Sequence, residues 1–251
     1  MKIFALADLH LSFGISGKEM DVFGKQWEGW TEKISTQWNE HVGKDDLVLI
    51  AGDISWAMHP EDAKADFDWI DDLPGTKAII RGNHDYWFSS AKKAREALPS
   101  SIHLVHHDVF HWNGVDIAGT RLWDTPEFSF EKYIHFVENP KAKVSLGERE
   151  SKEQMEKIYE RELHRLCLSL QQLTSDTRLV MTHYPPIGAD LKASRASQLF
   201  EEYNVQKVIF GHLHSLKKDV QMFGELNGIE YILSSCDYLG FCPKMILDLS
   251  E

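Results

Sequence analysis

The sequence LVLIAGD at residues 47–53 carries the pattern from which the architecture of this chain is inferred. Five apolar residues end abruptly at Gly52 and Asp53, and no polar residue alternates among them. A short, continuous apolar run of this kind is typical of a strand that is buried on both faces of a sheet. Runs of the same form occur at residues 3–7, 78–80, 179–181 and 208–210. These runs predict a set of buried strands.

Segments with helical periodicity separate the apolar runs, and they span residues 27–42, 60–70, 91–98, 148–173 and 193–203. Asn113-Gly114 predicts a hairpin between residues 109–110 and 115–118, because both central residues of this turn favour positive φ. Residues 229–233 and 245–249 are expected to form further strands. We therefore predict an α/β fold, a four-layer α-β-β-α sandwich with two mixed sheets and a helical insertion.

Length and composition fit one domain that covers residues 1–251, with the cap-like helical insertion at about residues 125–175. An apolar fraction of 43% supplies a sizeable core, and no stretch approaches the eighteen apolar residues of a membrane span. The three cysteines form no CxxC pair, which disfavours a disulfide framework or a zinc-thiolate site. A reduced, cytoplasmic setting is expected. The sequence does not indicate an oligomeric state.

The charge of the chain bears on its partners, because 27 Lys and Arg against 39 Asp and Glu give a net charge of −12. Non-specific affinity for nucleic acids comes largely from basic residues that displace counterions from phosphates. An excess of carboxylates repels such a polyanion unless a local basic groove overrides it. The composition therefore disfavours a nucleic acid as partner.

Polar residues that can bind metal ions follow five of the predicted strands, at the place where an α/β fold forms its ligand crevice. They are Asp8, His10, Asp53, Asn83, His183, His212 and His214. Carboxylate, amide oxygen and neutral imidazole together suit Mn²⁺, Fe or Zn²⁺ better than Ca²⁺ or Mg²⁺. Seven donors are too many for one catalytic ion with an open position, but they divide well between two ions that share a carboxylate. In Asp8-Leu9-His10 and His212-Leu213-His214, an extended backbone would direct both polar side chains to one side.

With these residues in view, the sequence resembles the calcineurin-like metallophosphoesterase superfamily. The resemblance rests on five short motifs in order, which are Asp8-Leu9-His10, Gly52-Asp53, Gly82-Asn83-His84-Asp85, Thr182-His183 and Gly211-His212-Leu213-His214. Each motif alone is common, but five in this order, each after an apolar run, are specific. The motifs span residues 8–214, which is most of the chain.

The resemblance implies a metal-dependent phosphoric ester hydrolase, either a phosphatase or a phosphodiesterase, that attacks a small phosphate ester by a metal-bridging hydroxide. It implies two divalent ions, with Mn²⁺ as the first choice and Fe or Zn²⁺ as alternatives. One ion would be held by Asp8, His10, Asp53 and His214, and the other by Asp53, Asn83, His183 and His212. Asp53 would thus bridge the ions in the catalytic centre, and His84 would contact the phosphate and protonate the leaving oxygen.

Trp56 departs from the family pattern, because many relatives carry an acidic residue there that orients the histidine equivalent to His84. Asp85 or another carboxylate could orient His84 instead. Arg121 is the preferred contact to substrate phosphate over Arg81 and Arg195, although a surface ion pair explains each arginine equally well. The aromatic residues that flank the motifs either belong to the core or offer a stacking surface to the substrate. They are Trp56, Tyr86, Trp87, Trp123 and Tyr184.

Three other functions remain open at this point. A nuclease or DNA-repair phosphodiesterase would need a basic groove and salt-dependent DNA binding. A non-catalytic scaffold on the same fold would have lost ligands, whereas this set is complete. A phosphoesterase that acts on lipid-linked substrates would expose an apolar or basic amphipathic surface.

Overall fold

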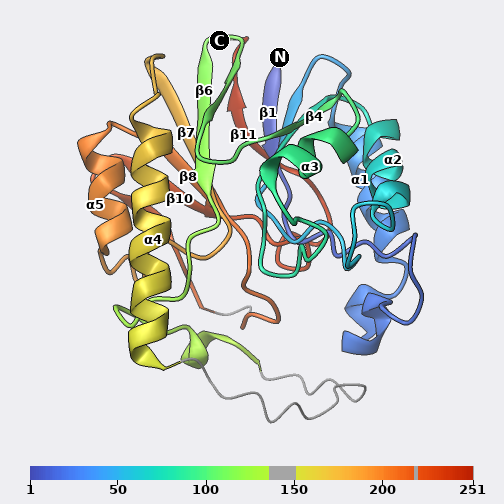
Figure 1. The fold of residues 1–251 in the computed structure, drawn as a ribbon, viewed down its shortest axis with the longest axis horizontal. Helices are drawn as coiled ribbons and strands as arrows, with labels where there is room; N and C mark the ends of the chain where they lie inside the picture. The colour runs from blue at the N-terminus through green and yellow to red at the C-terminus, as the bar shows by residue number, and fades with distance from the viewer. Residues whose placement is uncertain (136–150, 218–219, 251) are drawn as a thin grey trace.

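The computed structural model describes residues 1–135, 151–217 and 220–250, and it contains two β-sheets that face each other. Helices cover the outer surface of each sheet, so that four layers follow one another as helices, sheet, sheet and helices (Figure 1). Both sheets combine parallel and antiparallel strands. The predicted α-β-β-α sandwich with two mixed sheets is confirmed.

The first sheet has the strand order β11-β1-β2-β3-β4. Its strands are β1 (Lys2–Ala5), β2 (Leu47–Ile50), β3 (Thr76–Ile79), β4 (Ile102–Leu104) and β11 (Lys244–Asp248). Strands β1 to β4 are parallel, and β11 pairs with β1 in the antiparallel direction. Parallel pairing brings the carboxyl ends of β1, β2 and β3 to the same edge.

The second sheet has the order β5-β6-β7-β8-β10-β9. Its strands are β5 (Val109–Trp112), β6 (Val115–Thr120), β7 (Thr177–Thr182), β8 (Lys207–Phe210), β9 (Gly224–Leu226) and β10 (Ile229–Leu233). The predicted hairpin joins β5 to β6, and both Asn113 and Gly114 have positive φ, at 46° and 81°. Strands β6, β7, β8 and β10 run parallel.

The helices divide between the two outer layers. Helices α1 (Trp30–His41), α2 (Lys64–Asp72) and α3 (Ala91–Ala97) cover the first sheet, whereas α4 (Lys152–Leu170) and α5 (Arg195–Glu202) cover the second (Figure 1). Short 3-10 helices are η1 (Met20–Phe23), η2 (Lys25–Trp27) and η3 (Glu131–Tyr133). No helix in the described ranges is both long and apolar enough to cross a membrane.

The continuous apolar runs are explained by burial on both faces of each strand. In β2, Leu47 and Leu49 lie between the two sheets, whereas Val48 and Ile50 pack against the helices outside. All four side chains are fully buried. Because successive side chains of a strand point to opposite faces, a strand between two apolar layers requires an apolar residue at every position.

The expected bounds differ from the observed ones mainly at the ends of elements. Strand β1 ends at Ala5, two residues before the predicted end, because Ala7 leaves the first sheet and forms a bridge with Ser235 after β10. Helix α1 begins at Trp30 because Gly29 has a φ of 60° and residues 25–27 form η2. Strands β4 and β9 have only three residues each, and their patterns were too short to predict.

The predicted insertion at residues 125–175 is described only in part, because residues 136–150 lie outside the described residues. Its helix α4 begins with a capping box, in which the Ser151 side chain accepts from the Gln154 amide and the Gln154 side chain accepts in return. Helix α4 packs on β6 of the second sheet. The extent of the insertion over the strand ends stays a prediction.

Candidate metal centre

Seven predicted donors converge where the carboxyl ends of strands from both sheets meet. Asp8 and His10 follow β1, Asp53 follows β2, and Asn83 follows β3 in the first sheet. His183 follows β7, and His212 and His214 follow β8 in the second sheet. Neighbouring pairs of these side chains lie within 4 Å of each other. The two-sheet arrangement therefore gathers donors that are up to 206 positions apart, from residue 8 to residue 214.

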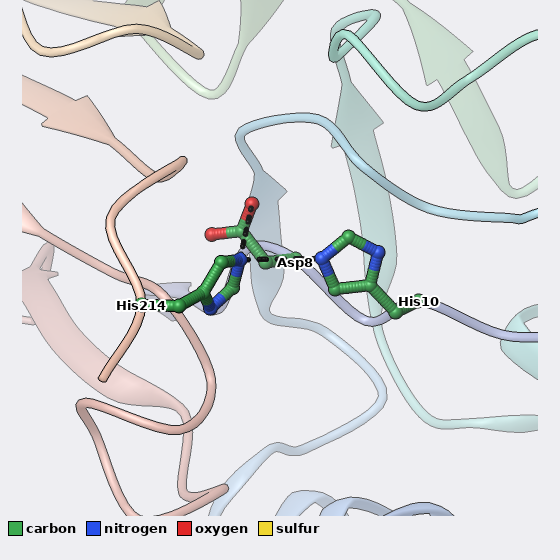
Figure 2. Close-up of side chains that lie close together, drawn as sticks. All are labelled: Asp8, His10 and His214. Atoms are coloured by element: carbon green, nitrogen blue, oxygen red, sulfur yellow. Dashed lines mark hydrogen bonds and ion pairs between the residues drawn. The ribbon is translucent and has the colours of Figure 1, made fainter. Parts of the chain in front are cut away.

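The first cluster consists of Asp8, His10 and His214 (Figure 2). The Nε2 atoms of His10 and His214 are 3.2 Å apart, and Nε2 of His214 lies 3.8 Å from Oδ1 of Asp8. One ligand atom of each residue lies within 4.8 Å of the others. Figure 2 shows that the ring of His214 faces both the carboxylate of Asp8 and the ring of His10, which its Nε2 approaches. This spacing suits a single cation that all three side chains contact.

The second cluster lies next to the first and contains Asp8, Asp53 and His183 within the same 4.8 Å limit. Nε2 of His183 lies 3.5 Å from Oδ2 of Asp53 and 2.6 Å from Oδ1 of Asn83. The Asn83 oxygen is also 2.9 Å from Nδ1 of His212. Oδ2 of Asp53 is in turn 3.9 Å from Nε2 of His10. Asp8 is therefore common to both clusters, and Asp53 of the second cluster also lies close to His10 of the first.

The backbone at the donors is not extended. Asp8, His10, Asp53 and His212 have φ values of 60°, 48°, 52° and 72°, in the left-handed region that non-glycine residues rarely adopt. The expectation that Asp8-Leu9-His10 and His212-Leu213-His214 converge through an extended backbone was therefore wrong. Left-handed residues instead bend the chain at the ends of β1, β2 and β8. Such conformations cost free energy and concentrate at functional sites.

Two glycines of the motifs are required by close packing rather than by an unusual φ. A Cβ atom on Gly82 would lie 2.1 Å from Oδ1 of Asp53, and one on Gly211 would lie 2.4 Å from Oδ2 of Asp8. Any larger residue would displace a carboxylate of the cluster.

Two rings of the centre are held in a defined tautomer. Nδ1 of His183 donates to the carbonyl oxygen of Ala51 over 2.9 Å, and Nδ1 of His214 donates to Oδ1 of Asp237 over 2.9 Å. A neutral imidazole carries one proton, so Nε2 of each ring directs a lone pair into the clusters. These lone pairs face the acceptor oxygens of Asp8 and Asp53. Neutral rings would therefore place acceptors against acceptors, so either a proton on each ring or a metal ion must lie between them.

The electrostatics of the centre follow from burial and close charges. Burial alone would lower the pKa of His183 and His214, but neighbouring carboxylates outweigh it and raise each pKa to about 9. Burial likewise opposes the charge of Asp53, yet the histidines, His183 first, hold its pKa well below the usual range. Among the described residues, no lysine or arginine lies within 4.0 Å of the Asp8 or Asp53 carboxylates. In the absence of a metal, protons on these histidines therefore neutralise the site.

His84 lies at the edge of the centre. Its backbone amide donates to Oδ1 of Asp53 over 2.8 Å, and its ring packs against Trp56 with centroids 4.4 Å apart. Nδ1 of His84 is 3.3 Å from the hydroxyl oxygen of Tyr86. Burial lowers the pKa of His84, so the ring is neutral near pH 7 in the free protein. An aromatic contact thus occupies the place where many relatives have a carboxylate.

Asp85 does not orient His84, because its carboxylate binds the surrounding backbone. It accepts from the amides of residues 53, 54, 55 and 82 and from the indole of Trp87, at 2.7–3.2 Å. These bonds join the turn after β2 to the turn after β3. Asp85 therefore fixes the position of Asp53 through its main chain.

The three candidate arginines lie in different surroundings. Arg121 is 3.8 Å from Glu162 and stacks over Trp123, although its carbonyl oxygen accepts from the amide of His183. Arg81 lies over the ring of Phe88, and its buried Nε has no hydrogen-bond partner among the described residues. Arg195 is paired with three glutamates, 127, 156 and 160, of which the first two lie within 2.7 Å. The role of Arg121 toward phosphate stays a prediction.

Asp237 was missed by the sequence interpretation. It follows β10 in the segment Ser234-Ser235-Cys236-Asp237, and its second oxygen accepts from the Ser215 amide over 3.0 Å. A signal was available, because β10 is an apolar strand whose carboxyl end carries polar residues, as at the other five sites. A carboxylate that receives the second ring proton of a ligand histidine fixes its orientation and raises its basicity.

Comparison with known proteins places this site in context. The family model described as calcineurin-like phosphoesterase matches residues 1–216. Two curated relatives match shorter stretches. The Gene 66 protein of Mycobacterium phage L5 is 46% identical over 52 residues, which are 21% of this chain and 25% of that protein. The Gene 66 protein of Mycobacterium phage D29 is 33% identical over 83 residues, which are 33% of this chain and 40% of that protein. The matched stretches thus cover less than half of either relative.

Among solved structures, the phosphopantetheinyl hydrolase of Mycobacterium tuberculosis is similar over its whole length. The superposition covers 100% of this chain and 97% of that one, with a TM-score of 0.55 and 13% sequence identity. At this identity the likeness concerns the fold alone.

Proposed function

The chain belongs to the calcineurin-like phosphoesterase family, and on that basis we propose that it hydrolyses phosphate esters with a pair of divalent cations bound at the carboxyl edge of its sheets. Asp8, His10, Asp53 and His214 hold one ion in this proposal. Asp53, Asn83, His183 and His212 hold the other. The observation that carries the proposal is the convergence of ring nitrogens on buried carboxylate oxygens, at 3.5 Å for His183 and Asp53 and at 3.8 Å for His214 and Asp8.

The donor chemistry supports this assignment. Nδ1 of His10 is buried without a hydrogen-bond partner among the described residues, and its Nε2 is opposite the Nε2 of His214. A proton shared by the two rings satisfies this contact in the metal-free protein, and a metal ion that replaced the proton would be ligated by both rings and by Asp8. Carboxylate, amide and imidazole ligands together suit Mn²⁺, Fe or Zn²⁺, with Mn²⁺ as the first choice.

When bound, such a pair of ions lowers the pKa of a shared water and polarises the phosphoryl oxygens. The chain's own residues supply the positioning. Asp53 is held by the amide of His84 and by the Asp85 network, so that its second oxygen faces both clusters. The His84 ring lies beside His10, with centroids 5.8 Å apart. It can therefore reach a phosphate that approaches the clusters.

His84 is suited to donate a proton to the leaving oxygen. Its pKa is lowered by burial in the free protein. The negative charge of a phosphate bound beside the ring opposes this effect and favours the protonated form. Trp56 packs against the ring, and the hydroxyl of Tyr86 lies beside its Nδ1. Both contacts are with uncharged side chains.

The substrate class that we propose is a small phosphate mono- or diester. The net charge of −12 disfavours a nuclease that binds nucleic acid through an electropositive groove. The completeness of the donor set favours an enzyme over a scaffold.

The test uses protein stripped of metal by a chelator and reloaded with Mn²⁺, Zn²⁺, Fe²⁺ or Mg²⁺. A panel of phosphomonoesters and diesters should be hydrolysed by the reloaded protein and not by the stripped one. Asp53→Asn should abolish most of this activity, whereas Asp176→Asn, an exposed position before β7, should retain it. Turnover by stripped protein, or full activity of Asp53→Asn, would contradict the proposal.

A further inference from the structure

A cavity of about 290 Å³ opens directly beside the metal centre. Three histidines of the site, His10, His84 and His214, form one of its walls. A ligand phosphate at the clusters therefore lies next to this space. Whatever group is esterified to the phosphate on that side must enter the cavity or pass it.

The apolar part of the lining comes mainly from the segment between β1 and α1. Met20 and Phe23 belong to η1, and Trp27 belongs to η2. Trp56 and Ile134 complete the apolar lining. None of these five residues belongs to the motifs that carry the metal ligands.

The two tryptophans are fixed against the histidines of the centre. Trp56 stacks on His10 with centroids 5.0 Å apart and planes at 20°, and its indole N–H donates to the sulfur of Met20 over 3.4 Å. Trp27 is 1% exposed and meets His214 edge-on at 5.9 Å. The apolar surface is therefore in place before a ligand binds, which reduces the entropic cost of binding.

The cavity offers little to a polar ligand. Among the described residues that line it there is no Asp, Glu, Lys or Arg, and the polar side chains are four histidines and Ser215. The indole N–H of Trp56 is already used by Met20. A second phosphate would lose its hydration here without a cationic partner on the described lining, because Lys18, whose Nζ lies 5.2 Å from the centre of the Trp56 ring, is not a lining residue.

We propose that this cavity binds an uncharged, apolar group of the substrate, so that the preferred phosphate esters are those of hydrophobic alcohols or phenols. The inference rests on the proposed phosphoesterase function, since it takes the phosphate to lie at the metal clusters. Phe23 is the residue best suited to test it, because it lines the cavity and is only partly buried.

The test measures the binding of methyl-, butyl- and octylphosphonate to the Mn²⁺-loaded protein by titration calorimetry, which needs no turnover. Each methylene buried in the cavity should lower Kd about fourfold, which gives roughly a 50-fold tighter binding of butyl- than of methylphosphonate. Phe23→Ala should reduce this dependence on chain length. Phe13→Ala is the matched control, because Phe13 lies in the same segment, is exposed and packs on Trp69 outside the cavity.

The outcomes separate this inference from the proposed function. Equal affinities for the three phosphonates, no binding of any of them, or equal effects of the two alanine variants would overturn the cavity assignment, even for a protein that hydrolyses phosphate esters. A dependence on chain length in a protein that hydrolyses no ester of the panel would support the cavity and contradict the phosphoesterase. If Phe23→Ala does not fold, the dependence of Kd on chain length in Phe23→Leu and in the wild type tests the cavity assignment.

Discussion

Replacement of Asp237 by asparagine tests whether the contact behind His214 supports metal binding. The Asp237 carboxylate accepts two hydrogen bonds, from Nδ1 of His214 at 2.9 Å and from the Ser215 amide at 3.0 Å. Asparagine offers one acceptor oxygen, so its NH₂ group would face one of these donors. A charge-assisted hydrogen bond contributes about 1.5–3 kcal/mol. Carboxylates behind ligand histidines typically change metal affinity by about 10- to 100-fold.

At pH 7 a second effect offsets part of the loss in metal affinity. Asp237 also favours the protonated, metal-free form of His214, whose pKa it helps to raise to about 9. We therefore expect the lower end of the range, about tenfold weaker Mn²⁺ binding. Equilibrium dialysis of chelator-stripped protein measures this affinity, with Asp176→Asn as the surface control. Unchanged affinity in Asp237→Asn, or an equal loss in Asp176→Asn, would refute the reasoning.

Four further predictions concern the same centre and its surroundings. Asp53→Asn should weaken both ions, and metal analysis after gel filtration should find fewer than two per chain. Because carboxylates keep His183 and His214 protonated near pH 7, metal binding should release close to two protons, measurable by calorimetry in buffers of different ionisation enthalpy. Protons and metal ions compete for the same ring nitrogens, so the metal should be lost by about pH 5. Gly82→Ala should cost about 1–3 kcal/mol in denaturant unfolding, because its Cβ would lie 2.1 Å from Asp53. Burial raises the pKa of Asp66 to about 6, so the folded protein holds a proton that the unfolded chain loses above about pH 4. The free energy of unfolding should therefore fall by up to about 3 kcal/mol between these pH values. Asp66→Asn should flatten this dependence of the unfolding free energy on pH.

The strands were predictable because their signal is local. In residues 47–50 every side chain is apolar, and the structure buries all four between two layers. The hairpin at Asn113-Gly114 was equally clear, since its positive φ values depend on those two residues alone. The ends of elements were less predictable. The end of β1 depends on Ser235, which lies 228 positions after Ala7 and takes that residue out of the first sheet.

The identity of the candidate ligands was also available from the sequence, but their surroundings were not. The residue types at the strand ends fix which cations they prefer, since ligand chemistry belongs to the side chain itself. The backbone conformation of the same residues was mispredicted. Four of the seven adopt positive φ, which remains uncommon for any single aspartate or histidine, although both residue types are enriched in the left-handed region.

The sequence alone determined the layered α/β architecture, the candidate metal-binding donors and the family to which they point, because periodicity, strand ends and ligand types are properties of short segments. Only the tertiary structure decided that Asp237 supports His214, that Asp85 anchors the turn at Asp53, and that an apolar wall from η1 and η2 stands beside the metal centre. Each of these contacts joins segments that are distant in the chain. The first two contacts follow from the order of the strands in each sheet, since β2 lies beside β3 and β8 lies beside β10, and no local pattern encodes that order.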